Sequence, residues 1–199
     1  KHYAKEFDQY CIMVDDARRL DVEESMAYKA WSTDQFSGVL AKHTSDIQKM
    51  KGMTIRKRVC MIQVLSKIYR ETCLPYPTNI VDTVHIKLPL IANKRNEDLL
   101  TIIKGAARKL DNYSKSVEEF VEHLTFLSKI GSELPALENE FNLVNKLFTI
   151  AKDYSVDIKP EEMALYQTLA PSFQGLKNTI LYNEAKKDEN IRKFSRDLD

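Results

Sequence analysis

The sequence has 199 residues, of which 43% are hydrophobic and 30% charged, so it is too apolar for a disordered chain and long enough for one large domain or two small ones. Its 5 Gly and 6 Pro are too few for the many tight turns of a β-sandwich, and no stretch reaches the roughly 20 apolar residues of a membrane span. Because the first residue is Lys1, we expect a piece of a longer protein. The composition predicts an all-α fold, with successive helix pairs or bundles in an elongated array.

Charge is arranged in blocks of alternating sign, although the net charge is only +1. Residues 42–70 carry a charge of +7, and residues 116–165 carry −6. Such blocks suit segments that pack on one another or on charged neighbours, and solvated helix faces give the same pattern. Cys11, Cys60 and Cys73 form no CxxC pair, which disfavours a disulfide framework and a zinc site. A reducing, intracellular compartment fits these cysteines best.

Residues 1–73 are predicted to form an N-terminal helical bundle segment. Apolar residues at helical spacing indicate a helix over about 4–19 and a shorter one over 21–28. Ser32 and Gln35 form a capping box for a helix that reaches about Met50, and Gly52 marks a break. Another helix is predicted over 55–71, with an apolar stripe made by Val59, Ile62, Leu65, Ile68 and Tyr69.

Residues 74–93 are predicted to form an extended connector. Pro75 and Pro77 lack a backbone N–H and restrict the residue before them, so they disfavour a continuing helix. From Val84 to Leu90 apolar residues alternate with other residues, which is the period of a half-buried strand. Pro89 limits such a strand to an edge position. One short extended segment is therefore expected near residues 80–91.

Residues 94–199 are predicted to form a C-terminal helical bundle. Asn93 would cap a helix over about 94–113, and Ser116 with Glu119 would cap a helix that ends before Gly131. A new helix would start near Ser132 and would carry a seam of apolar residues spaced three and four apart. This seam consists of Leu134, Leu137, Phe141, Val144, Phe148 and Ala151.

After a connector at 154–159, Pro160 followed by two glutamates indicates the start of another helix. Pro171 should kink or split that helix, and a last helix is expected over about 184–198. Since the connector is short, we expect the seam to face a second apolar stripe on an antiparallel helix. That stripe consists of Met163, Tyr166, Leu169 and Phe173.

The motifs of common active sites are absent: the sequence has no GxxxxGK[ST], GxGxxG, GxSxG or HExxH. Glu119 and His123 are two potential ligands only, too few for a metal site, and Cys60 adjoins apolar residues without a visible base. We therefore predict no catalytic, cofactor-binding or metal-binding residues in this segment.

One cluster of cations is a candidate partner contact: Lys49, Lys51, Arg56, Lys57 and Arg58. No aromatic residue interleaves this basic patch, which disfavours a nucleic-acid site. An acidic protein surface suits it better, and a simply solvated face is the plainer alternative.

The C-terminal half resembles the dynein heavy chain, at the end of the tail where it enters the linker. The matching pattern is Glu-Glu-Phe at 118–120, Leu-x-x-Leu-Glu at 134–138, Tyr-x-Val-x-Ile-x-Pro-Glu-Glu at 154–162 and Leu-Tyr-x-x-Leu at 165–169. The end of the chain, with Lys193-Phe194 and Leu198, resembles the Lys-Phe-x-x-x-Leu that follows in this family. The resemblance covers residues 78–199 well and the rest loosely, and axonemal heavy chains are the more similar type.

This resemblance implies a non-catalytic strut that joins an anchoring tail to the lever of an ATP-driven microtubule motor in cilia or flagella. ATP and magnesium would bind elsewhere in the full-length chain. The implied partners are other segments of the same heavy chain, and intermediate chains, light chains or axonemal docking proteins, with no nucleic acid or membrane. The implied location is cytoplasmic, in the axoneme. An unrelated helical scaffold or adaptor, a small module that binds an acidic partner through residues 49–58, and an enzyme fragment remain alternatives.

Overall fold

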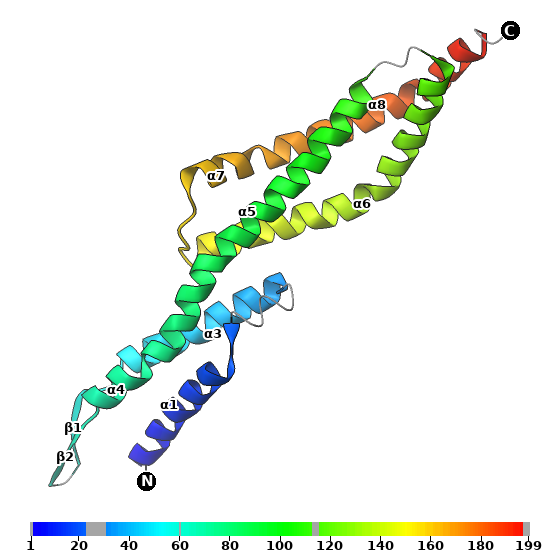
Figure 1. Cartoon of the computed structure of the whole chain (residues 1–199). Coiled ribbons are helices and arrows are strands. Elements are labelled where there is room, and N and C mark those ends of the chain that lie inside the picture. The colour runs from blue at the N-terminus through cyan, green and yellow to red at the C-terminus, as the bar shows by residue number, and fades with distance from the viewer. Residues whose placement is uncertain (1, 23–30, 60, 113–115, 197–199) are drawn as a thin grey trace. The chain divides into compact units, whose positions relative to one another are not determined.

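The computed structural model describes residues 2–22, 31–59, 61–112 and 116–196, and it confirms the all-α class, with one two-stranded hairpin added (Figure 1). The chain divides into two compact units. Unit 1 comprises Lys1–Leu90 with Thr149–Asp157, and unit 2 comprises Ile91–Phe148 with Ile158–Asp199.

Unit 1 is built from α1 (His2–Arg19), α3 (Thr33–Lys51), the strands β1 (Arg56–Val59) and β2 (Ile62–Leu65), α4 (Lys67–Cys73) and the first part of α5 (Pro75–Asp111). Its apolar core joins three of these helices, because Tyr10 and Val14 of α1 pack with Met50 at the end of α3 and with Cys73 of α4. An exposed ion pair, with Lys42 Nζ 2.8 Å from Asp16 Oδ2, adds a second link between α3 and α1.

The predicted helices over 4–19 and 33–50 are confirmed. Ser32 caps α3 as expected, since its hydroxyl accepts from the Gln35 N–H while the Gln35 side chain accepts from the Ser32 N–H. Gly52 follows the last turn and donates to the carbonyls of Gln48 and Met50. The helix expected over 21–28 lies almost entirely outside the described residues.

The helix predicted over 55–71 is wrong, because this segment forms an antiparallel hairpin followed by the short helix α4. The expected apolar stripe is not buried: Ile62, Leu65 and Ile68 are 69%, 59% and 75% exposed. An apolar stripe stabilises a helix only when it packs against a core, and in the described residues no core covers Ile62, Leu65 or Ile68. β-branched residues such as Ile62 and Val64 favour strands, so the strand conformation prevails.

The extended connector predicted over 74–93 is also wrong, because α5 runs without a break from Pro75 to Asp111. Pro75 and Pro77 occupy the first turn, where the N–H groups have no intrahelical acceptor. Of the four alternating apolar residues, only two belong to the buried face of this helix. Val84 and Leu88, which are four positions apart, are fully buried. The other two members, Ile86 and Leu90, are 65% and 55% exposed.

Burial on this face of α5 outweighs the hydrogen bond that Pro89 removes inside the helix. Asn93 accordingly lies in the middle of α5 and is not an N-cap.

Unit 2 contains the rest of α5, most of α6 (Val117–Asp153), α7 (Pro160–Gln167) and α8 (Leu169–Arg196). The helix start at Pro160 is confirmed, and the expected split falls at Thr168, so that Pro171 lies in the first turn of α8. The separate helix predicted over 184–198 is wrong, because α8 continues through this region to Arg196. Leu198 lies outside the described residues.

The predicted helix break at Gly131 is wrong as well, since α6 passes through Gly131 and Pro135. Ser116 does cap this helix, accepting from the Glu119 N–H at 3.2 Å, but Ser132 donates to the Lys129 carbonyl and caps nothing. The buried residues Ile130 and Leu137 lie on either side of the expected break, so packing favours one helix. Figure 1 shows that α6 changes direction along its length, as an internal proline permits.

One polar pair lies in the interior of unit 1. His43 and Asp46 of α3 are both buried, and His43 Nδ1 lies 3.7 Å from Asp46 Oδ2. Burial lowers the pKa of His43, and this effect outweighs the nearby carboxylates of Asp46 and Asp16, which act in the opposite direction. The folded chain therefore favours the neutral imidazole.

We expect acid to destabilise the chain through His43. The unfolded chain binds a proton on His43 below a pH of about 6.5, whereas the folded chain resists it, so stability falls as the pH drops below that value. Urea unfolding between pH 7.5 and pH 5.0 should show a smaller loss of stability in His43→Leu than in the wild type. An identical pH dependence in both proteins would contradict the assignment.

Candidate functional site

The seam of α6 faces α7 and α8 in unit 2, and two aromatic stacks join them. The rings of Phe141 and Phe173 stack with centroids 5.0 Å apart and planes inclined by 17°. The rings of Phe148 and Tyr166 stack at 3.9 Å and 9°. Each such pair contributes about 0.5–1.5 kcal/mol beyond the area that it buries. The two stripes expected from the sequence therefore do meet.

Burial along the seam is uneven. Leu137, Val144 and Phe148 are buried, whereas Leu134 and Phe141 are partly exposed. Ala151, the last residue of the seam, is buried in unit 1. Within unit 2, the seam is therefore most deeply buried at Val144.

A hydrogen bond fixes the ring of Tyr166 within this contact. Its hydroxyl donates to Asn145 Oδ1 at 2.9 Å, and burial raises the pKa of Tyr166. The phenol thus stays protonated as a donor at neutral pH. Because a partly buried hydroxyl without a partner would cost some free energy, this bond favours one orientation of the stacked ring.

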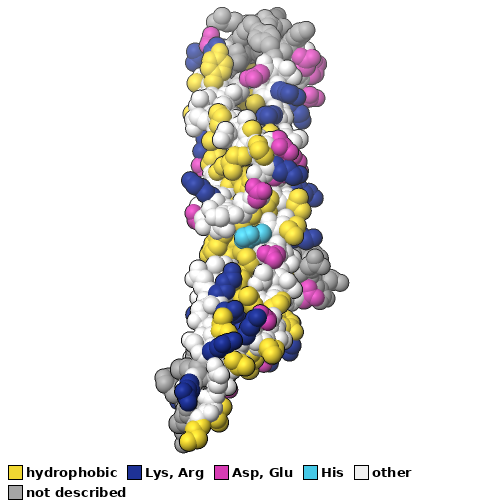
Figure 2. Space-filling view, turned by 90° about the vertical axis from the view of Figure 1, so that its left-hand side faces the viewer, with side chains coloured by type: hydrophobic (Ala, Val, Ile, Leu, Met, Phe, Trp, Pro, Cys, Tyr) yellow, Lys and Arg dark blue, Asp and Glu magenta, His cyan; other side chains and the backbone are white. Residues whose placement is uncertain are grey.

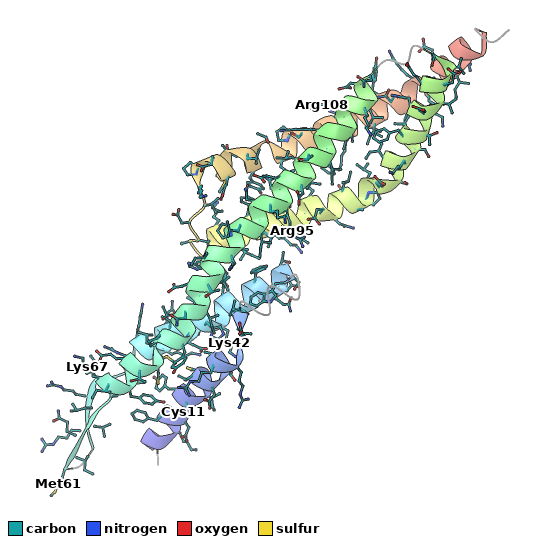
Figure 3. All side chains as sticks on the ribbon, in the orientation of Figure 1. Cys11, Lys42, Met61, Lys67, Arg95 and Arg108 are labelled. Carbon is teal, nitrogen blue, oxygen red and sulfur yellow. The ribbon has the colours of Figure 1, made fainter. Side chains whose placement is uncertain are left out.

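Charged side chains link α6 to its neighbours on two sides. Arg95 of α5 donates to Glu140 of α6 at 3.0 Å. Figure 3 labels Arg95 on α5. Lys177 of α8 donates to Glu138 at 2.7 Å, and its ammonium group lies 4.7 Å from the centre of the Phe173 ring. Partly exposed pairs of this kind contribute about 0.2–1 kcal/mol each, so they orient the helices more than they stabilise them.

Asn183 of α8 contacts two further helices of unit 2. Its side-chain oxygen lies 3.2 Å from His123 Nε2 of α6, and its amide donates to the Leu110 carbonyl in the last turn of α5 at 3.4 Å. Carbonyls at the end of a helix lack intrahelical partners, so this contact caps α5. Sequence inspection missed Asn183, because an isolated polar residue on a long helix has no local signature.

The basic patch lies in unit 1, but not on one helix. Lys49 and Lys51 are in the last turn of α3, and Arg56 and Arg58 are on β1, while the side chain of Lys57 lies outside the described residues. Lys49 Nζ is 3.9 Å from Asp46 Oδ1. Figure 2 shows Lys and Arg side chains gathered with hydrophobic ones toward the hairpin end of unit 1.

The described residues contain no group of three or more His, Cys, Asp or Glu side chains that could hold a metal ion. His123, considered above beside Glu119, contacts Asn183. Within the same described ranges, no helix combines the length and apolar character needed to cross a bilayer.

We predict that Phe148→Ala destabilises the chain by about 3–5 kcal/mol, because it removes a buried ring and leaves a cavity against Tyr166. Phe141→Ala should cost less, since Phe141 is partly exposed. Tyr182→Ala on α8 is the matched control, because Tyr182 is 58% exposed and its loss should cost under about 1 kcal/mol. Urea melts measure all three, and equal midpoints for Phe148→Ala and Tyr182→Ala would show that the seam is not core.

Comparisons with known proteins also find dynein heavy chains. No protein-family model matches the chain. Two human proteins match it at 23% identity: dynein axonemal heavy chain 6 over 96% of this chain, and dynein axonemal heavy chain 14 over 99%. The chain spans only 5% and 4% of the length of these relatives. Over almost its whole length, it is therefore similar to a short segment of dynein heavy chains.

Proposed function

We propose that the chain is a non-catalytic, force-transmitting segment of a dynein heavy chain, located where the tail enters the linker. The observation that carries this proposal is the packing of α6 in unit 2. Its seam stacks on Phe173 and Tyr166, while ion pairs hold it to α5 and α8. A strut needs packed helices of this kind rather than a pocket.

The length of the helices supports the same role. Helices α5 and α6 have 37 residues each, so each is about 55 Å long if straight. Isolated helices are marginally stable in water and gain most of their stability from tertiary packing. In unit 2 the lateral contacts of α6 supply that packing, and they would let the helices bear load without local unfolding.

The remaining parts of the proposal follow from the similarity to axonemal heavy chains. The segment would act in the axoneme of a cilium or flagellum, as part of a microtubule motor whose ATP and magnesium bind elsewhere in the full-length chain. Its partners would be neighbouring segments of the same heavy chain, with intermediate chains, light chains or docking proteins as candidates.

The reading frame beyond Asp199 tests this assignment. Sequencing of the transcript should reveal a linker and, further along the same frame, a GxxxxGK[ST] loop whose backbone N–H groups can cradle the phosphates of ATP. A frame that ends without any such loop would contradict the motor-chain assignment and would favour a separate helical scaffold.

A further inference from the structure

The hairpin of unit 1 presents an unpaired strand edge. No third strand pairs with β1 or β2 in the part of the chain that the structure describes. Figure 3 shows the labelled Met61 at the hairpin tip, beyond α4 and away from the other elements of unit 1, and Met61 is 98% exposed. Gln63 and Leu65 of β2 are exposed as well. Natural proteins usually pair, cover or charge such an edge.

The register identifies which backbone groups point outward. Ser66 N–H donates to the Ile55 carbonyl at 3.0 Å, so the facing residues 55 and 66 belong to a hydrogen-bonded pair. Pairs alternate along an antiparallel ladder, and Arg56↔Leu65 and Arg58↔Gln63 are therefore non-hydrogen-bonded pairs. It follows that the N–H and C=O groups of Gln63 and Leu65 point away from β1 and are free to pair with another strand.

The two edges of the hairpin differ in charge. Strand β1 contains Arg56, Lys57 and Arg58, and rows of charge of this kind protect an edge from strand addition. Strand β2, with the sequence Ile-Gln-Val-Leu, has no charge and two β-branched residues. Only the β2 edge therefore combines outward backbone groups with strand-forming side chains.

Charge around the hairpin selects the kind of partner. Residues 47–70 contain seven Lys or Arg and no Asp or Glu. Because residues that face each other in a ladder lie on the same side of the sheet, Arg56 and Arg58 share a face with Leu65 and Gln63. A strand added beside β2 would meet this cationic face, which is complementary to carboxylates.

We propose that the β2 edge accepts an extended, acidic segment of another polypeptide as a third strand. Backbone bonds to Gln63 and Leu65 would supply the pairing, and carboxylates near Arg56 and Arg58 would supply selectivity. A second copy of the chain is disfavoured as the occupant, because the same seven cations would face each other. This inference does not depend on the force-transmitting role.

The test uses the 199-residue chain and a fluorescent peptide of about eight residues in which Glu and Val alternate. We expect fluorescence anisotropy to show binding that weakens with salt. Gln63→Pro should weaken binding about fivefold or more, because it removes one outward N–H, whereas Gln63→Ala keeps this donor and should bind normally. The N–H of Gln63 forms no bond within the hairpin, so both variants should keep the pairing of β1 with β2. Slow hydrogen exchange of the Val64 N–H in both variants, followed by NMR, would verify that the hairpin is intact.

The charge contribution is tested separately. The double variant Arg56→Ala/Arg58→Ala should weaken binding about fivefold or more, whereas Arg108→Ala, at an exposed position on α5, should leave it unchanged. A version of the peptide with methylated backbone nitrogens should not bind, because it cannot complete the ladder.

Four outcomes would overturn the proposal: no binding of the Glu–Val peptide, equal binding of the methylated peptide, equal binding by Gln63→Pro and Gln63→Ala, or an unchanged affinity in the double arginine variant. Tighter binding of a single-stranded oligonucleotide than of the peptide would also overturn it and would reassign the patch to nucleic acid.

Discussion

Unit 2 depends on the contact between the apolar seam of α6 and the helices that return after the connector at 154–159. Val144 and Phe148 are buried on this seam, and Phe148 stacks on Tyr166 of α7 while Phe141 stacks on Phe173 of α8. These rings bring together residues that are 18 to 32 positions apart in the chain. Since a single helix cannot bury its own stripe, the seam is what makes unit 2 a folded body.

The polar contacts of unit 2 set orientation around this apolar centre. Glu140 and Glu138 of α6 reach Arg95 of α5 and Lys177 of α8, on the two sides of the seam. Farther along, Asn183 contacts both His123 and the end of α5. Such contacts are individually weak, but together they favour one relative position of the helices within unit 2.

The parts of the fold that the sequence predicts correctly are those with a local cause. Ser32 with Gln35, and Pro160 with its following glutamates, form helix starts because capping depends on residues within one turn. The seam of α6 is recognisable because its period continues over the 18 residues from Leu134 to Ala151. The candidate pairing of this seam with Tyr166 and Phe173 follows from the apolar spacing of both stripes and from the short connector between them.

The wrong secondary-structure predictions concern segments whose residues suit two conformations, where packing against residues distant in the sequence decides between them. Pro89 and the alternation near Val84 predict an extended segment, yet burial of the α5 face makes a helix. Gly131 is typical of a helix end, yet α6 continues past it, because the burial of Ile130 and Leu137 favours one continuous helix.

Around the basic patch the opposite occurs: a segment predicted to be helical forms strands. Its apolar spacing suggests a helix, but no partner covers the stripe in the described residues, and strand preference prevails in a hairpin. The free edge of β2 could not be predicted from the sequence, because it depends on the register.

Mechanical unfolding tests most directly whether the seam makes this chain a strut. Optical tweezers attached to the two ends of the chain would record the unfolding force of the wild type, Phe148→Ala and Tyr182→Ala at one loading rate. The account predicts a cooperative step in the wild type, an unchanged force in Tyr182→Ala, and a clearly lower force in Phe148→Ala, because that variant loses the stacked and buried ring. Equal forces in all three proteins, or gradual extension of the wild type without any step, would contradict it.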